Sequence, residues 1–187
     1  MGMPLPKMTL AEYMAWETAQ PDRHEFYRGE TFAMVGGPSG HNRVIVNLTR
    51  RIDAHLDGTP CHVFSENMKL QLADEACFYP DVMVTCGKVF TGDELAVTEP
   101  LLIVEVLSPS TQGYDRRNKF ILYRSLASLR EYALIDPATR TVEVFTWTDS
   151  GAWLLTDQTN LGTLTLASID CKLPLEWVFK GMDHDSA

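Results

Sequence analysis

Seven residues in the second half of the chain, Leu101 to Leu107, form the hydrophobic segment around which the fold is expected to be organised. Six of them are aliphatic, and the segment is bounded by Pro100 on one side and by Ser108-Pro109-Ser110 on the other. A short apolar run between such residues is typical of a strand that is buried on both faces. The pattern therefore predicts the central strand of a sheet.

The charged residue of this segment, Glu105, shares a face of the predicted strand with Ile103 and Leu107, because side chains alternate along a strand. An ionised carboxylate in an apolar layer must be compensated by a buried cation, by a proton or by a shared metal ion. A candidate for the second metal ligand is Asp81, at the start of the β-prone segment Tyr79 to Val84. Two acids at the ends of neighbouring strands suit a hard cation such as magnesium.

Periodicity predicts further elements on both sides of this centre. A capping box formed by Thr9 and Glu12 predicts a short amphipathic helix. An apolar stripe predicts a longer helix from about His41 to Leu56, with Ser39 near its N-cap. Alternation predicts strands at 31–35, 61–72, 131–135, 141–147, 152–156 and 162–169, with the fourth and fifth joined as a hairpin. Helical segments are further expected at 93–96, 114–126 and 175–179.

Length and charge limit the classes of function. With 187 residues, 45% of them hydrophobic, the chain is long enough for one well-buried domain. Sixteen Lys and Arg against 25 Asp and Glu give a net charge of -9, the wrong sign for holding nucleic acid by bulk electrostatics. A nucleic-acid function would therefore need a local basic patch, metal ions, or both. No apolar run approaches the roughly 20 residues that span a bilayer, so no membrane interaction is expected.

The four cysteines, Cys61, Cys77, Cys86 and Cys171, show neither paired CxxC spacing nor the density of a disulfide scaffold. They are interpreted as reduced thiols of a cytoplasmic protein. The first residues also lack the apolar core of a signal peptide, which favours the same location.

The two acids stand in short motifs that resemble a known signature. Pro80-Asp81 and Glu105-Val106-Leu107, separated by 23 residues, resemble the divided acidic motif of the PD-(D/E)XK nuclease superfamily. The neighbouring motifs are Arg23 to Glu30, Met34 with Pro38 and His41, Ser108 to Thr111, Tyr114-Asp115-Arg116 with Lys119 and Tyr123, and Asp136-Pro137. Taken in order, over roughly residues 8 to 180, they resemble the Uma-two family of restriction endonuclease-like proteins, found in cyanobacteria and other bacteria.

This resemblance implies an α/β, restriction endonuclease-like fold with a mixed central β-sheet flanked by helices and an additional C-terminal β-hairpin. The whole chain, 1–187, would form a single domain with its core at about 8–180. The implied activity is hydrolysis of DNA phosphodiester bonds by an endonuclease that uses Mg²⁺ or Mn²⁺. Asp81 and Glu105 would bind the metal, with the backbone carbonyl of Val106 as a further ligand. Glu25 would complete the shell, the alternative being a surface acid beside two arginines.

The catalytic lysine of the superfamily is expected two residues after the second acid, where this sequence has Leu107. The resemblance implies that Lys119 replaces it, orienting or deprotonating the attacking water or neutralising charge on the phosphate. The alternative is that Lys119 pairs with Asp115, four residues earlier, on a solvated helix face. In either case the lysine is expected at an exposed rim, where it contributes little to stability.

Weaker candidates surround these residues. His41, Tyr123 and Glu66 could support the metal ligands, although a histidine at a helix start is more often a half-buried residue with a structural role. Arg116 and Arg117 belong to the densest basic group in the sequence and are the candidates for DNA binding.

A homodimer is the expected assembly, because two copies of one active site most simply cut both strands of a duplex. The apolar edges near Phe32 and Trp147 are the candidate interface. A different class of function is a catalytically degenerate module that uses the same scaffold for nucleic-acid binding or dimerisation. The presence of both Asp81 and Glu105 argues against such decay, because a buried carboxylate pair without a metal is destabilising.

Overall fold

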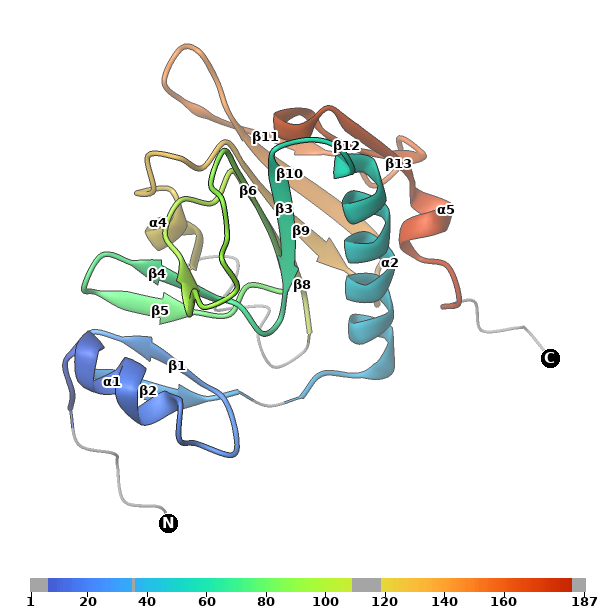
Figure 1. Cartoon of the computed structure of the whole chain (residues 1–187). Coiled ribbons are helices and arrows are strands. Elements are labelled where there is room, and N and C mark those ends of the chain that lie inside the picture. The colour runs from blue at the N-terminus through green and yellow to red at the C-terminus, as the bar shows by residue number, and fades with distance from the viewer. Residues whose placement is uncertain (1–6, 35, 109–118, 183–187) are drawn as a thin grey trace.

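The computed structural model describes residues 7–34, 36–108 and 119–182, and a mixed six-stranded sheet lies at its centre (Figure 1). Its strands, in spatial order, are β11 (Trp153–Asp157), β10 (Thr141–Trp147), β9 (Glu131–Asp136), β8 (Leu102–Val106), β6 (Val82–Cys86) and β3 (Cys61–Ser65). Strand β8 pairs with β9 in parallel and with β6 in antiparallel orientation. All five residues of β8 are buried, which confirms the predicted central strand.

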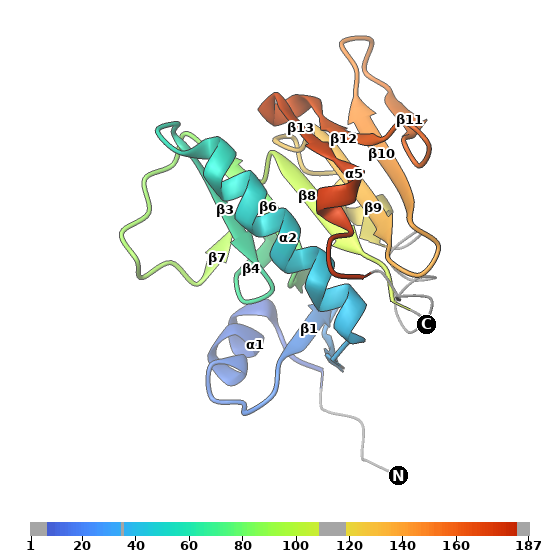
Figure 2. The same cartoon turned by 90° about the vertical axis from the view of Figure 1, so that its right-hand side faces the viewer.

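One face of this sheet is covered by helices (Figure 2). They are α2 (Ser39–Leu56) and α5 (Leu175–Val178), next to a two-stranded sheet of β12 (Thr163–Leu166) and β13 (Cys171–Pro174), which a 3-10 helix (Ala167–Ile169) connects. The apolar stripe of α2 packs here against the side chains of β8 that alternate with Glu105, namely Leu102, Val104 and Val106. The expected α/β arrangement of a mixed sheet with flanking helices is therefore present, and β10 and β11 form the expected C-terminal hairpin.

A second sheet and a short helix cover the opposite face. In spatial order this sheet contains β2 (Glu30–Ala33), β1 (His24–Tyr27), β5 (Ala76–Phe78), β4 (Lys69–Leu72) and β7 (Ala96–Val97), and the helix is α4 (Phe120–Tyr123). Ile103 and Leu107 point into this layer, as does the residue between them, Glu105. The acid thus lies in the apolar interior between the two sheets, on the predicted face of its strand.

The N-terminal helix α1 (Leu10–Glu17) has the predicted capping box. The Thr9 hydroxyl accepts from the Glu12 amide at 3.3 Å, and the Glu12 carboxylate accepts from the Thr9 amide at 2.7 Å. Leu10 and Tyr13 pack on Phe26 of β1, so the helix is fixed against the second sheet. Helix α2 also matches its prediction, but it begins at Ser39 with Pro38 as the N-cap rather than Ser39.

The predictions for two segments, 61–72 and 93–96, are wrong. The segment 61–72 is two strands in different sheets rather than one, because Glu66 adopts a left-handed conformation (φ 47°) that turns the chain between β3 and β4. The helical turn expected at 93–96 is absent, and Ala96–Val97 instead pairs in parallel with β4. Of the helix expected over 114–126, residues 114–118 lie outside the described residues, and the rest contains α4.

The cysteine prediction is also wrong for one pair. Cys61 and Cys86 lie opposite each other in the β3–β6 register and form a disulfide, whereas Cys77 and Cys171 are free and buried. Antiparallel pairing brings the first two together, and their separation of 25 residues in the sequence gave no sign of it. The cytoplasmic location, which rested partly on four thiols, stays a prediction.

Across the described ranges, none of the helices combines the length and the apolar character needed to cross a bilayer.

The outer strands of both sheets carry exposed apolar side chains. Phe32 on the edge strand β2 is 45% exposed, and Leu155 on the edge strand β11 is 49% exposed, while Trp147 on the adjoining strand β10 is also exposed. We expect a homodimer in which one of these edges is covered, with a light-scattering mass near twice 21.0 kDa. Leu155→Lys should dissociate it if β11 is the interface, and Val89→Lys, at an exposed loop position, should not. A monomer mass for the wild type at high micromolar concentration would contradict the expectation.

Candidate active site

The two predicted metal ligands lie side by side between the ends of β6 and β8. Val82 pairs with Val104 in the register of these strands, so Asp81, just before β6, lies across from Glu105. The Asp81 amide donates to Glu105 Oε2 at 3.4 Å, and the Val106 amide donates to Asp81 Oδ2 at 2.7 Å. The structure therefore brings together Asp81, Glu105 and Val106, as the sequence motif predicts.

Glu105 is held from its other side by two donors. Its Oε1 accepts a hydrogen bond from the Tyr123 hydroxyl at 2.9 Å and one from Lys119 Nζ at 3.4 Å. Burial, followed by the charge of Glu105, raises the pKa of Tyr123 well above its usual value, so this phenol remains a donor. Tyr123, a weaker candidate in the sequence, thus contacts a predicted metal ligand directly.

Lys119 is buried, with only 6% of its surface exposed. Its Nζ lies 2.9 Å from Glu25 Oε1 and 3.4 Å from Glu105 Oε1. The prediction of a lysine on a solvated helix face or exposed rim is therefore wrong. The helical register alone could not reveal this, because the acids that surround the ammonium come from two different sheets. Its expected partner Asp115 lies outside the described residues.

Glu25, on β1, also lies at this site rather than on the surface. Its Oε1 accepts from Lys119 Nζ and, at 3.3 Å, from the amide of Tyr79. Among the described residues, no three His, Cys, Asp or Glu side chains converge closely enough to hold a metal by themselves. The role of Glu25 as a metal ligand stays a prediction, and the contacts that the structure gives it are an ion pair with Lys119 and the hydrogen bond from Tyr79.

His41, in the first turn of α2, faces the other acid. Its Nε2 lies 3.3 Å from Asp81 Oδ2, and its side chain is 15% exposed. Burial alone would lower the pKa of the imidazole, but the hydrogen bond to Asp81 and the charge of that carboxylate raise it overall. His41 therefore partners Asp81 as Lys119 partners Glu105, so both of these acids contact a basic side chain.

The chemistry of the donor set fits a hard divalent cation. Asp81 and Glu105 offer carboxylate oxygens, the ligands that Mg²⁺ and Mn²⁺ prefer, and Val106 adds a backbone carbonyl next to them. The side chain of Asp81 is 16% exposed, so the pair is open to solvent on one side. Two protein carboxylates completed by water are a common arrangement for Mg²⁺.

A cavity of about 520 Å³ opens next to Asp81. It lies between the turn before β1, the connection from β2 to α2, the first turn of α2 and the turn after β3. Its lining residues are Pro21, Asp22, Arg23, Met34, Gly36, Gly37, His41, Asn42, Glu66, Tyr79 and Asp81. Glu66, the third of the weaker candidates, thus borders the cavity, and its amide donates to the carbonyl of Asp81 at 3.3 Å.

The sequence did not single out a buried acid that supports this site. The Glu17 side chain is 2% exposed, and its Oε1 accepts from the Tyr79 hydroxyl at 2.9 Å and from the His24 amide at 2.8 Å. It therefore ties α1 both to the residue before Glu25 and to the segment that leads into Asp81. Its position four residues after Tyr13, on the buried face of α1, is the signal that could have revealed it.

Two of the predicted DNA-binding residues cannot be placed. Arg116 and Arg117 lie outside the described residues, so their role stays a prediction.

Comparison with known proteins finds a family and relatives to which this chain is similar. The Uma2 family model, described as "Putative restriction endonuclease", matches residues 10–176. Two uncharacterized proteins of Synechocystis sp. are similar over most of their length. Protein slr1290 is 34% identical over 96% of this chain and 95% of its own, and protein sll1609 is 38% identical over 80% and 86%.

A solved structure shares the fold. It is a crystal structure from Anabaena variabilis, described as a putative nuclease belonging to DUF820, and it superposes with a TM-score of 0.74 at 17% identity. The alignment covers 92% of this chain and 97% of the other. The restriction endonuclease-like fold is thereby shown, and the match of the family model over most of the chain places this protein in the Uma2 family.

Proposed function

We propose that this protein is an endonuclease that hydrolyses DNA phosphodiester bonds with Mg²⁺ or Mn²⁺. The observation that carries the proposal is the pairing of Asp81 and Glu105 across β6 and β8, with Lys119 buried against Glu105. Membership of a family described as "Putative restriction endonuclease" supports the same activity. Asp81, Glu105 and the Val106 carbonyl would hold the cation.

When bound, the divalent cation would polarise the scissile phosphate and lower the pKa of an attacking water. The protein's own groups keep the two carboxylates in position for this task. Tyr123 and Lys119 fix Glu105 Oε1, which leaves Oε2 directed towards Asp81. The Val106 amide fixes Asp81 in turn. Side chains held by such hydrogen bonds need little reorganisation during the reaction.

Lys119 would act on the phosphate or on the attacking water. Its ammonium group lies within 3.4 Å of Glu105, so it stands next to the site at which negative charge develops. A positioned cation there stabilises that charge, which is worth more in a water-poor site than in solvent.

The direct test is cleavage of labelled duplex, single-stranded and branched DNA by the purified protein with Mg²⁺, with Mn²⁺ and with chelator. We expect metal-dependent internal cleavage of at least one substrate, absent from Asp81→Asn. If the wild type binds metal yet cleaves none of them, the protein is better explained as a binding module on the same scaffold.

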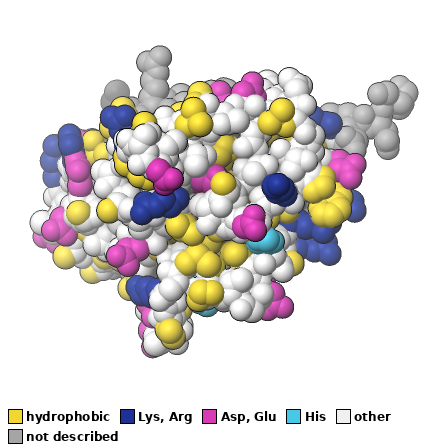
Figure 3. Space-filling model, turned by 90° about the horizontal axis from the view of Figure 1, so that it is seen from above, with side chains coloured by type: hydrophobic (Ala, Val, Ile, Leu, Met, Phe, Trp, Pro, Cys, Tyr) yellow, Lys and Arg dark blue, Asp and Glu magenta, His cyan; other side chains and the backbone are white. Residues whose placement is uncertain are grey.

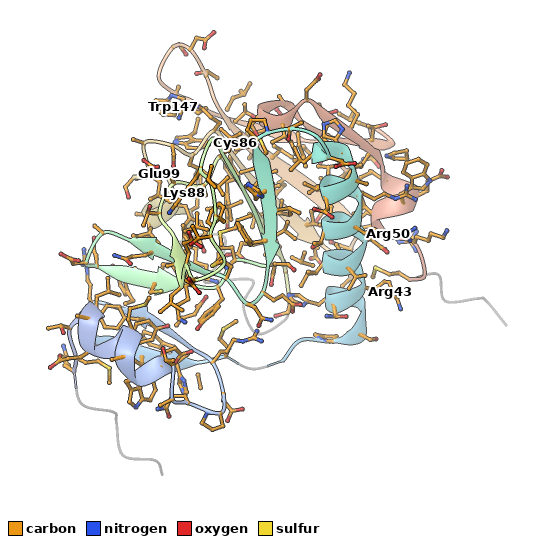
Figure 4. All side chains as sticks on the ribbon, in the orientation of Figure 1. Arg43, Arg50, Cys86, Lys88, Glu99 and Trp147 are labelled. Atoms are coloured by element: carbon orange, nitrogen blue, oxygen red, sulfur yellow. A yellow bond between two sulfur atoms is a disulfide. The ribbon has the colours of Figure 1, made fainter. Side chains whose placement is uncertain are left out.

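Contact with the DNA backbone needs local positive charge. On the face shown in Figure 3, Lys and Arg side chains lie in several separate places among acidic and uncharged ones. Helix α2 carries two basic residues on one side. Arg43 and Arg50 are exposed and project on the side remote from β3 and β6 (Figure 4). Seven residues apart, they lie about 10 Å from each other along the helix axis. Arg51 stacks on Trp177 beside them, at 4.0 Å from the ring centroid.

Charge reversal tests this surface. Arg43→Glu/Arg50→Glu should weaken binding of single-stranded DNA and reduce the slope of log K against log salt by about 1.4, the value for two phosphate contacts. Fluorescence anisotropy over a salt series measures both quantities. Lys88→Glu/Lys172→Glu makes the same change in net charge at exposed positions on other elements and should affect affinity less. Equal losses for the two pairs would point to a general charge effect, and Arg116→Glu/Arg117→Glu would then be the next variant.

A further inference from the structure

The cavity next to Asp81 extends the candidate active site in one direction. Asp81 and His41 belong both to the site and to the cavity wall, so a nucleic-acid strand with its phosphate at Asp81 would have the adjoining nucleotide at the cavity. The inference about which substrate this cavity prefers rests on the proposed nuclease function, because that function places the scissile phosphate at Asp81.

Two lining residues, Arg23 and Asn42, present polar groups that suit a nucleotide. Among the described lining residues, Arg23 is the only Lys or Arg. Its Nη1 donates to the carbonyl of Glu66 at 3.1 Å, and its guanidinium lies 5.9 Å from the centroid of the Tyr79 ring, so both contacts orient it. A guanidinium has five N–H donors, of which this hydrogen bond uses one, and its geometry suits phosphate. Asn42 adds an amide that can both donate and accept.

The connection from β2 to α2 adds little side-chain bulk to the lining. Gly36 and Gly37 line the cavity without side chains, and a Cβ built on Gly36 would meet no atom within 4 Å. Helix α2 starts directly after this connection with no acid in its first turn and no side-chain cap. The start of a helix favours a negatively charged group, so this helix start, unlike the lining acids Asp22, Glu66 and Asp81, does not oppose the phosphate that Arg23 would bind.

The size of the cavity limits what can enter it. A volume of about 520 Å³ lies within the range of roughly 300–1,000 Å³ that holds one drug-sized ligand, which is also the size of one nucleotide. A paired nucleotide would bring its complement and the second strand with it, and the net charge of -9 opposes the extra phosphates of a duplex. Enzymes that act on a single base likewise take it out of the stack.

We infer that this cavity receives one unpaired nucleotide of DNA next to the scissile phosphate, with Arg23 bound to the phosphate of that nucleotide. The preferred substrate is therefore single-stranded DNA or an unpaired segment within a branched or frayed duplex.

Binding measurements test this inference separately from cleavage. The probe is a fluorescein-labelled ten-residue oligothymidylate, alone or annealed to its complement, measured by anisotropy in chelator so that no metal-dependent cleavage occurs. We expect the wild type to bind the single strand at least about tenfold more tightly than the duplex. Gly36→Leu, which adds a large side chain to the cavity lining, and Arg23→Gln, which removes its cation, should each weaken single-strand binding by about tenfold.

Two controls keep the result specific. Ala152→Leu adds the same side chain in the exposed turn between β10 and β11 and should bind the single strand like the wild type. Gly36→Leu, Arg23→Gln and Ala152→Leu should all keep the wild-type melting temperature. A Cβ at Gly36 would meet no other atom within 4 Å, and Arg23 and Ala152 are exposed. Equal or tighter binding of the duplex, or wild-type binding by Gly36→Leu, would overturn the inference.

The cleavage assay separates this inference from the proposed function. If single-strand binding depends on Gly36 and Arg23 but no DNA is cut with Mg²⁺ or Mn²⁺, the nuclease proposal fails and the nucleotide site stands. If duplex and single strand are cut equally by the wild type and by Gly36→Leu, the nuclease proposal stands and the nucleotide site fails.

Discussion

Asp81→Asn is expected to abolish DNA cleavage and to remove the stabilisation of the protein by divalent metal. The substitution keeps a side-chain oxygen that can accept from the Val106 amide, so the local fold should survive, but it removes the charge that a hard cation requires. A ligand that binds only the folded state at 100 times its dissociation constant adds about 2.7 kcal/mol. For a chain of this size, that corresponds to a rise in melting temperature of roughly 5–10 °C in the wild type.

Thermal melts with and without Mg²⁺ or Mn²⁺ measure the stabilisation by metal, and two further variants serve as comparisons. Glu105→Gln should lose the metal response as Asp81→Asn does, because the two carboxylates face each other across one site. Asp93→Asn, at an exposed loop position, removes the same charge and should respond like the wild type. The shared metal site does not exist if metal leaves the wild-type melting temperature unchanged, or raises that of Asp81→Asn equally.

The centre of the fold and the acid pair could be predicted because both depend on local patterns. A run of six aliphatic residues around Glu105 fixes a buried strand, and the two-residue alternation fixes the face on which the acid lies. Asp81 is expected at the start of a neighbouring strand, and antiparallel pairing of β6 with β8 places it across from Glu105.

Contacts between the two sheets could not be predicted in the same way. Lys119 and Glu25 are 94 residues apart, and they meet because β1 belongs to a second sheet packed against the six-stranded sheet. The division of segment 61–72 places β4 in that second sheet. It depends on the left-handed conformation of Glu66, a residue type that does not indicate a turn. Because the boundary between β3 and β4 was predicted wrongly, the residues that surround Lys119 could not be predicted.

The cavity next to Asp81 could not be predicted from the sequence either. Its walls come from connections rather than from periodic elements, and the pattern of apolar residues says little about where connections lie. Arg23 and Gly36 stand in or beside the motifs that resemble the family, yet only the folded chain shows that both line one space.

Lys119→Met is expected to destabilise the protein by about 3–5 kcal/mol, the usual effect of removing one partner from a buried ion pair. The ammonium contacts Glu25 and Glu105, whose carboxylates are nearly buried, and methionine would leave both without this counter-charge. The melting temperature should fall by roughly 6–20 °C in chelator. This differs from the small effect that an exposed lysine would give, so the same melt tests the burial of Lys119 directly.

A smaller deficit in Mg²⁺ than in chelator should accompany this loss, because a cation held by Glu105 restores positive charge to the site. Tyr123→Phe is the matched control, since it removes one hydrogen bond to the same Glu105 oxygen and leaves the lysine in place. It should cost only about 1–3 kcal/mol. Cleavage assayed well below both melting temperatures then separates chemistry from stability: Lys119→Met should be inactive although folded. If it cleaves as fast as the wild type, Lys119 has a structural role only, and Lys69, on β4 with its Nζ 5.4 Å from the Tyr79 ring centroid, becomes the lysine to test.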